Sequence, residues 1–173
     1  MKSTIASILS SPNLHQDYNV YGWVKSFRSN RFIALNDGST LKNLQCVVDF
    51  ENFDKTLLSQ ITIGSAIRVS GVLKESEGKG QSVEVEVSEV DILGLADTDE
   101  VKKTILQPKR HSLEKLREQA HLRVRTNTFG AIMRIRAKLS YAVHDYFNSN
   151  GFFYVNTPII TGSDAEGAGE MFK

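Results

Sequence analysis

The chain has 173 residues, of which 40% are hydrophobic and 24% are charged, and its formal net charge at pH 7 is +1. This composition is typical of a globular protein with a buried core, and the absence of any run of about 18 apolar residues excludes a membrane-spanning segment. The single cysteine, Cys46, excludes an intramolecular disulfide and a zinc cluster, and it favours a cytoplasmic location.

The N-terminal half of the sequence predicts a small barrel. A short helix begins after Ser3-Thr4, whose hydroxyl groups are suitable caps, and ends before Pro12. The hydrophobic period then changes to two, which predicts five strands, at Asn19–Arg28, Arg31–Asn36, Asn43–Phe50, Ala66–Lys74 and Ser82–Leu93. With a helix in Glu51–Gln60 after the third strand, this is the layout of an OB-fold barrel. A barrel of this size has no interior cavity, so a ligand must bind on its outer face.

The alternation within the strands predicts which side chains face the core. A slip of one residue would invert every side chain, so the inward set is Ile33, Leu35, Leu44, Cys46, Val48, Val83, Val85 and Val87. The outer face then holds Arg28, Phe32, Gln45 and Glu84. A phenylalanine among hydrogen-bonding groups suits the stacking of a single-stranded nucleotide, and a glutamine suits a Watson–Crick edge. The alternative is a phenylalanine that packs under a loop or a second domain, since outward glutamine and glutamate are common.

A linker follows the barrel. The polar segment Asp97–Lys103 marks a boundary, and Leu106-Gln107-Pro108 is expected to be an extended connector. After it, Ser112 caps a short helix that carries on one side Leu113, Leu116 and Ala120.

Basic residues are concentrated in and after this linker. Between Lys109 and Lys138, nine lysines and arginines stand against two glutamates. Such a patch attracts a phosphate backbone, but a solvated helical face has the same composition, so both interpretations stay open. His111 and His121 have no cysteine partners, so we expect no metal site.

A long helix is predicted from Thr126-Asn127 to about Ser149. Its broad apolar stripe comprises Phe129, Ile132, Met133, Ile135, Leu139, Ala142, Val143, Tyr146 and Phe147. A stripe of this width exceeds what one neighbouring element usually covers and indicates a helix that is buried on several sides. Asn150-Gly151 suits a left-handed helix exit, and Phe152–Val155 is typical of a short buried strand, which Pro158 ends.

Several stretches resemble one family, the class II aminoacyl-tRNA synthetases. The anticodon-binding barrel of the aspartyl, asparaginyl and lysyl enzymes is similar to GWVKSFRSNRFIALNDGS, LQCVV and VEVEV. The first class II signature is similar to Gly151–Lys173, and the bacterial-type asparaginyl branch is similar to KRHSLEKLRE and SDAEGAGEMF. The resemblance implies an OB-fold anticodon-binding domain over residues 1–96 and a hinge over 97–125. It also implies the beginning of an α+β catalytic domain, with helices and an antiparallel sheet, over 126–173.

The resemblance also implies roles for individual residues. The family reads the central anticodon uridine with side chains that correspond to Arg28, Phe32, Gln45 and Glu84, although Glu86 has the same parity as Glu84. Its amino-acid-binding glutamate corresponds to Glu166, where a carboxylate would hold the substrate ammonium group. Ser163 and Asp164 would help to shape that pocket. The implied homodimer interface comprises Ile132, Ile135, Leu139, Tyr146, Phe153 and Pro158.

The implied activity is the ligation of asparagine to tRNA with ATP and Mg²⁺, so the implied partners are tRNA, asparagine, ATP and a second subunit. The later class II signatures and a Walker-type phosphate loop are absent from the 173 residues, and we therefore expect this stretch alone to lack catalytic residues and to be inactive. Two alternatives remain. One is an aspartyl- or lysyl-type synthetase, and the other is a non-catalytic OB-fold module that binds single-stranded nucleic acid.

Overall fold

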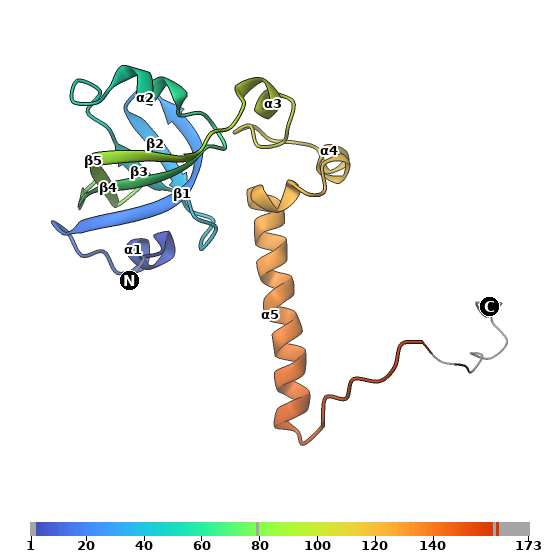
Figure 1. Cartoon of the computed structure of the whole chain (residues 1–173). Coiled ribbons are helices and arrows are strands. Elements are labelled where there is room, and N and C mark those ends of the chain that lie inside the picture. The colour runs from blue at the N-terminus through green and yellow to red at the C-terminus, as the bar shows by residue number, and fades with distance from the viewer. Residues whose placement is uncertain (1–2, 79, 161, 163–173) are drawn as a thin grey trace. The chain divides into compact units, whose positions relative to one another are not determined.

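The computed structural model describes residues 3–78, 80–160 and 162 (Figure 1). The chain divides into two compact units, Met1–Met133 and Arg134–Lys173. In the described ranges no helix is both long enough and apolar enough to cross a membrane.

The first unit contains a closed barrel (Figure 1). Its strands are β1 (Asp17–Arg28), β2 (Phe32–Asn36), β3 (Leu44–Val47), β4 (Ala66–Glu75) and β5 (Val83–Gly94). Around the barrel they follow the order β1-β2-β3-β5-β4, in which β3 and β5 are parallel and the other neighbours are antiparallel. The predicted five-stranded OB-fold is confirmed. The third strand was predicted to reach Phe50 but ends at Val47, because Asp49 turns the chain by accepting hydrogen bonds from the residues after it.

The strand parity predicted from the sequence is confirmed. All the side chains expected to face inward are buried, and the most accessible of them, Val87, is only 7% exposed. Strands β1 and β4 complete the core with Val20, Val24, Ile67, Val69 and Leu73. Burial raises the pKa of the Cys46 thiol to about 12, so this cysteine remains protonated and behaves as an apolar core residue.

Two short helices pack against the barrel. In α1 (Ile5–Ser10), Thr4 is the N-cap as predicted, and Ile5 and Ile8 are buried. The turn after β2 supports this helix, because Asp37 Oδ2 and Ser39 Oγ each accept a backbone N–H of its first turn at 2.9 Å. Between β3 and β4 lies α2 (Lys55–Gln60), whose Leu58 is buried. Both helices were predicted, although α2 begins later than Glu51 because Asp54 is its cap.

The linker contains more helix than the sequence analysis expected. Asp97 caps α3 (Thr98–Lys102), where we expected only a polar boundary, and turns replace the extended connector expected at 106–108. Helix α4 (Leu113–Glu118) has the predicted Ser112 cap and is followed by η1 (Arg123–Arg125). The apolar side predicted for α4 is largely wrong. Only Leu116 is buried, whereas Leu113 and Ala120 are exposed, because one turn and a half of helix offers a neighbour little contact.

The second unit contains most of α5 (Asn127–Ser149), which begins in the first unit and has the predicted bounds. Gly151 has a φ of 84°, which confirms the left-handed helix exit. The strand predicted at Phe152–Val155 is wrong for the described chain: no described segment pairs with it, and Phe153 is 93% exposed. A strand needs a neighbour to satisfy its backbone N–H and C=O groups, and β-favouring residues do not replace that neighbour.

Candidate nucleic-acid interface

Four candidate residues lie on the outer face of one side of the barrel. A tight turn at Ser29 and Asn30, both with positive φ, brings Arg28 directly opposite Phe32. Two residues further along β2, Ala34 lies opposite Gln45, and Gln45 lies opposite Glu84 on the parallel strand β5. Phe32 and Gln45 are therefore diagonal neighbours, which on a sheet are separated by about 7–8 Å at the Cα atoms. This spacing brings an aromatic ring and a polar pair within reach of a single base.

The ring of Phe32 is only partly covered. It lies on the opposite face of β2 from the buried Ile33, and the Arg31 guanidinium carbon is 5.5 Å from the ring centroid. Arg28 at the end of β1 is exposed. An accessible ring near two guanidinium groups suits a base that stacks while its phosphate approaches a cation.

Glu84 is held in place by three donors. Its Oε2 accepts hydrogen bonds from Gln45 Nε2 at 3.0 Å, from Ser76 Oγ at 2.7 Å and from Gln81 Nε2 at 3.2 Å. Within the described residues these donors all use the same oxygen, which leaves Oε1 to accept a bond from a ligand. Gln45 retains a second amide hydrogen and its carbonyl oxygen. A carboxylate acceptor beside an amide donor matches a base edge on which an N–H lies next to a carbonyl, as in uracil.

The structure distinguishes the environments of the two glutamates that share a parity on β5. Glu86 is exposed and forms an ion pair with Lys74 on β4. Glu84 instead lies opposite Gln45 and is bonded to it. Only Glu84 is therefore brought together with the predicted glutamine.

Ser76 and Gln81 also belong to this site and were not predicted from the sequence. Ser76 follows β4 and Gln81 precedes β5, and Gln81 Nε2 also donates to Ser76 Oγ at 3.1 Å. The turn between the strands brings these side chains together beside Glu84. The sequence signals these two residues only by a hydroxyl and an amide on either side of a glycine-rich turn. That pattern is also common in hairpins that bind no ligand.

An open groove of about 850 Å³ runs beside this polar pair. Arg28 and Lys42 contribute positive charge to its wall, and Gln45 and Gln81 contribute amides. The groove therefore presents positive charge and amide groups on the side of the barrel where Gln45 lies.

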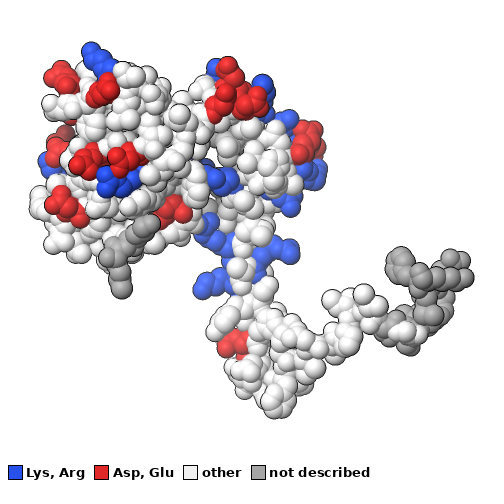
Figure 2. All heavy atoms as spheres, viewed as in Figure 1, with Lys and Arg blue, Asp and Glu red and all other residues white. Residues whose placement is uncertain are grey.

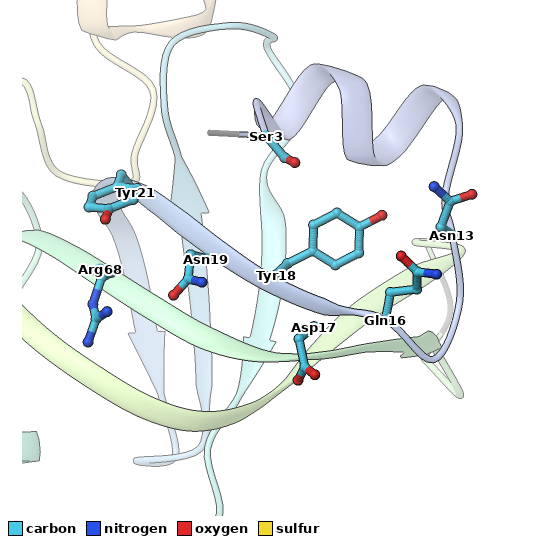
Figure 3. A pocket seen from close by; sticks show the side chains of 8 residues that line it. All are labelled: Ser3, Asn13, Gln16, Asp17, Tyr18, Asn19, Tyr21 and Arg68. Carbon is cyan, nitrogen blue, oxygen red and sulfur yellow. The ribbon is translucent and has the colours of Figure 1, made fainter. Parts of the chain in front are cut away.

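A second hollow lies elsewhere on the barrel, along β1 and β4. Figure 3 shows its polar lining, which includes Tyr18, Asn19 and Arg68. Arg68 forms ion pairs with both Glu89 and Asp91, and Asn19 Oδ1 accepts a bond from Ser70 Oγ at 2.7 Å. Because its cation is already neutralised, this hollow is a poor site for a phosphate.

The basic stretch identified in the sequence divides into two kinds of surface. On α4, Lys115 pairs with Glu118 and Arg117 pairs with Glu114, all on exposed side chains, which is the solvated-face alternative. Figure 2 shows acidic and basic side chains intermixed over the barrel, α3 and α4, and basic side chains along the first half of α5. The basic residues of α4 therefore do not form a surface free of acids.

Two other sets of residues were predicted, one for an amino-acid pocket and one for a subunit interface. Glu166, Ser163 and Asp164 lie outside the described residues. In the second unit the expected interface residues are exposed, as is Pro158, with Ile135, Leu139 and Tyr146 at 59%, 61% and 65%. The part of the chain that the structure describes contains no group of three His, Cys, Asp or Glu side chains that could hold a metal ion.

Two ranges of the chain match known protein families. Residues 18–93 match the OB-fold nucleic acid binding domain family, and residues 112–173 match the class II tRNA synthetases of the D, K and N group.

The chain is also similar to curated proteins along its whole length. It is 50% identical to the asparagine–tRNA ligase of Parabacteroides distasonis over 99% of this chain, and 49% identical to that of Borrelia garinii over 100% of it. It spans 37% and 38% of the length of these two relatives.

Solved structures show the same fold. The asparaginyl-tRNA synthetase of Pyrococcus horikoshii, complexed with asparaginyl-adenylate, has a TM-score of 0.81 at 21% identity, covering 97% of this chain and 39% of that one. The asparaginyl-tRNA synthetase of Entamoeba histolytica has a TM-score of 0.74 at 19% identity, covering 90% of this chain and 37% of that one.

Proposed function

We propose that the protein is an asparagine–tRNA ligase whose barrel recognises the anticodon, because residues 18–93 match an OB-fold nucleic acid binding family and residues 112–173 match the class II tRNA synthetases of the D, K and N group. In this proposal the whole protein activates asparagine with ATP and transfers it to its tRNA. The relatives at about 50% identity favour asparagine over aspartate or lysine. We place the protein in the cytoplasm, which agrees with a lone, buried and free Cys46.

One observation supports anticodon recognition most strongly: the hydrogen-bonded pair Gln45–Glu84 lies beside the accessible ring of Phe32. A splayed base would stack on Phe32 while its edge meets Gln45 and Glu84. A uracil N3–H would donate to Glu84 Oε1, and the adjacent carbonyl would accept from the free amide hydrogen of Gln45. Arg28 would contribute a charge-assisted bond from the end of β1.

Anticodon stem-loops that differ only in their middle base test this proposal. We expect uridine to bind about 5- to 150-fold more tightly than cytidine, because cytidine lacks the N3–H and leaves a polar group unpaired, at a cost of about 1–3 kcal/mol. Fluorescence anisotropy with labelled RNA measures the dissociation constants. Equal affinities for all four middle bases would instead identify a module that grips single strands without reading them.

The amino-acid pocket is a proposal from the family alone. Glu166 remains the candidate partner for the asparagine ammonium group, with Ser163 and Asp164 beside it. ATP–pyrophosphate exchange by the whole protein, measured with asparagine, aspartate and lysine in turn, identifies the substrate.

We also propose that α5 contributes to a homodimer. Its stripe exposes Ile135, Leu139 and Tyr146, and isolated soluble chains rarely leave so much contiguous apolar surface uncovered. Phe153 and Pro158 are candidates for the same interface. Sedimentation of the whole protein is expected to give a dimer, and a monomer at high concentration would contradict this assignment.

A further inference from the structure

A cationic pocket lies within the first unit, where the linker meets β1. This junction pocket has a volume of about 700 Å³, and its basic lining residues are Lys25, Lys109, Arg110 and Arg125. No aspartate or glutamate is among the described residues that line it. A hollow lined by four basic side chains and by no described acid prefers an anion.

Two of these cations are partly removed from water and held against each other. Lys25 Nζ donates a hydrogen bond to the Arg125 carbonyl oxygen at 2.8 Å. Burial, together with the neighbouring Arg125 charge, lowers the pKa of Lys25, and burial lowers the pKa of Arg125. Every ion pair found among the described residues involves other cations. Two like charges in such a position are unfavourable until an anion joins them.

The pair is also held in position before any ligand arrives. The Arg125 guanidinium carbon lies 4.1 Å from the centroid of the Trp23 ring, a cation–π contact between β1 and the linker. Trp23 and Lys25 come from the same strand, so one element orients both cations. A site arranged in this way binds its ligand with less loss of side-chain freedom.

The pocket is continuous with the groove beside Gln45. Ser26, Asn43 and Pro108 line both hollows. A chain that places a base near Gln45 can therefore continue into the junction pocket, whereas an isolated anion would use only one of the two. This continuity points to a polymer of phosphates.

We propose that the junction pocket binds a backbone phosphodiester of RNA, with Lys25 and Arg125 as its main contacts and Lys109 and Arg110 at its rim. The inference rests on the proposed function in that the RNA is the tRNA whose anticodon lies on the barrel face. It adds a second, sequence-independent contact that fixes the position of the RNA on the protein.

Salt dependence of stem-loop binding tests the inference. In Lys25→Met, the slope of log affinity against log salt concentration is expected to become shallower by about 1, while the middle-base preference remains. The matched control is Lys102→Met, which removes the same charge from α3, where Lys102 is exposed and paired with Asp99. An unchanged slope in Lys25→Met, or an equal change in both variants, would overturn the inference.

A second test uses the unmodified chain, so its outcome does not depend on whether a variant folds. Trp23 is the single tryptophan, so its fluorescence reports directly on Arg125. We expect the stem-loop to change this fluorescence at concentrations where inorganic phosphate does not. An equal response to inorganic phosphate would indicate a small-anion site, and no response to RNA would exclude phosphate contact at Arg125. Loss of base preference with this response intact would count against the anticodon proposal alone.

Discussion

Replacing Phe32 with alanine is expected to weaken binding of the uridine-containing stem-loop by about 1–3 kcal/mol, or roughly 5- to 150-fold. Phe32 lies diagonal to Gln45 across β2 and β3, and Gln45 lies opposite Glu84, so the ring is placed to stack a base whose edge meets this pair. Its removal abolishes stacking and leaves the polar pair to hold a base that is free to tilt. Fluorescence anisotropy at fixed salt measures the loss.

Two further substitutions separate stacking from simple apolar packing. Phe32→Tyr retains the ring and is expected to bind nearly as well as the unmodified chain, whereas Phe32→Leu retains apolar volume without a π face and should behave more like Phe32→Ala. The ring is outside the barrel core, so all three variants should unfold at similar urea concentrations. If Phe32→Ala bound the stem-loop as tightly as the unmodified chain, Phe32 would not be a stacking platform and would serve only in packing.

Gly71→Ala is expected to destabilise the barrel by about 3 kcal/mol, at the upper end of the cost of overpacking. A Cβ at this position would lie 2.1 Å from the Glu86 carbonyl oxygen and 2.9 Å from Val87 Cα, both in the backbone of β5. Backbone atoms in a paired strand cannot move aside without breaking the ladder between β4 and β5. The change would therefore also disturb Glu84, which lies on the same strand.

Gly94→Ala is the matched control for this effect. A Cβ there meets nothing closer than the Ala66 Cβ at 3.9 Å, and the substitution should change stability by no more than about 0.5 kcal/mol. Urea unfolding followed by Trp23 fluorescence gives both free energies. Similar stabilities for the two variants would show that the approach of β4 to β5 is looser than the structure indicates.

The barrel was largely predictable because the hydrophobic alternation that defines each strand can be seen within a few neighbouring residues. Alternation in β2, β3 and β5 settles the inward and outward sets, which places Gln45, Glu84 and Glu86 on the outer face, but parity does not choose between the two glutamates. The hydrogen-bond network around Glu84 was not predictable, because it depends on how the turn at Ser76 and Gln81 closes.

The features that were predicted wrongly or not at all depend on information that the local sequence does not carry, or carries ambiguously. The segment that forms α3 has a polar composition that is typical of a boundary, but Asp97 followed by two acids is also a helix start. The strand at Phe152–Val155 was predicted from propensity, which does not provide a pairing partner. The contact between Lys25 and Arg125 joins residues 100 apart in sequence, and no local pattern indicates it.

The most direct test of the account is to map RNA binding on the chain by NMR. The account predicts that the uridine-containing stem-loop shifts the amide signals of Phe32, Gln45 and Glu84 most strongly. Signals beside the second hollow, at Tyr18, Asn19 and Arg68, should change little. Strong shifts centred on that hollow, with Phe32 and Gln45 unaffected, would contradict the claim that the outer face of β1, β2, β3 and β5 reads the anticodon.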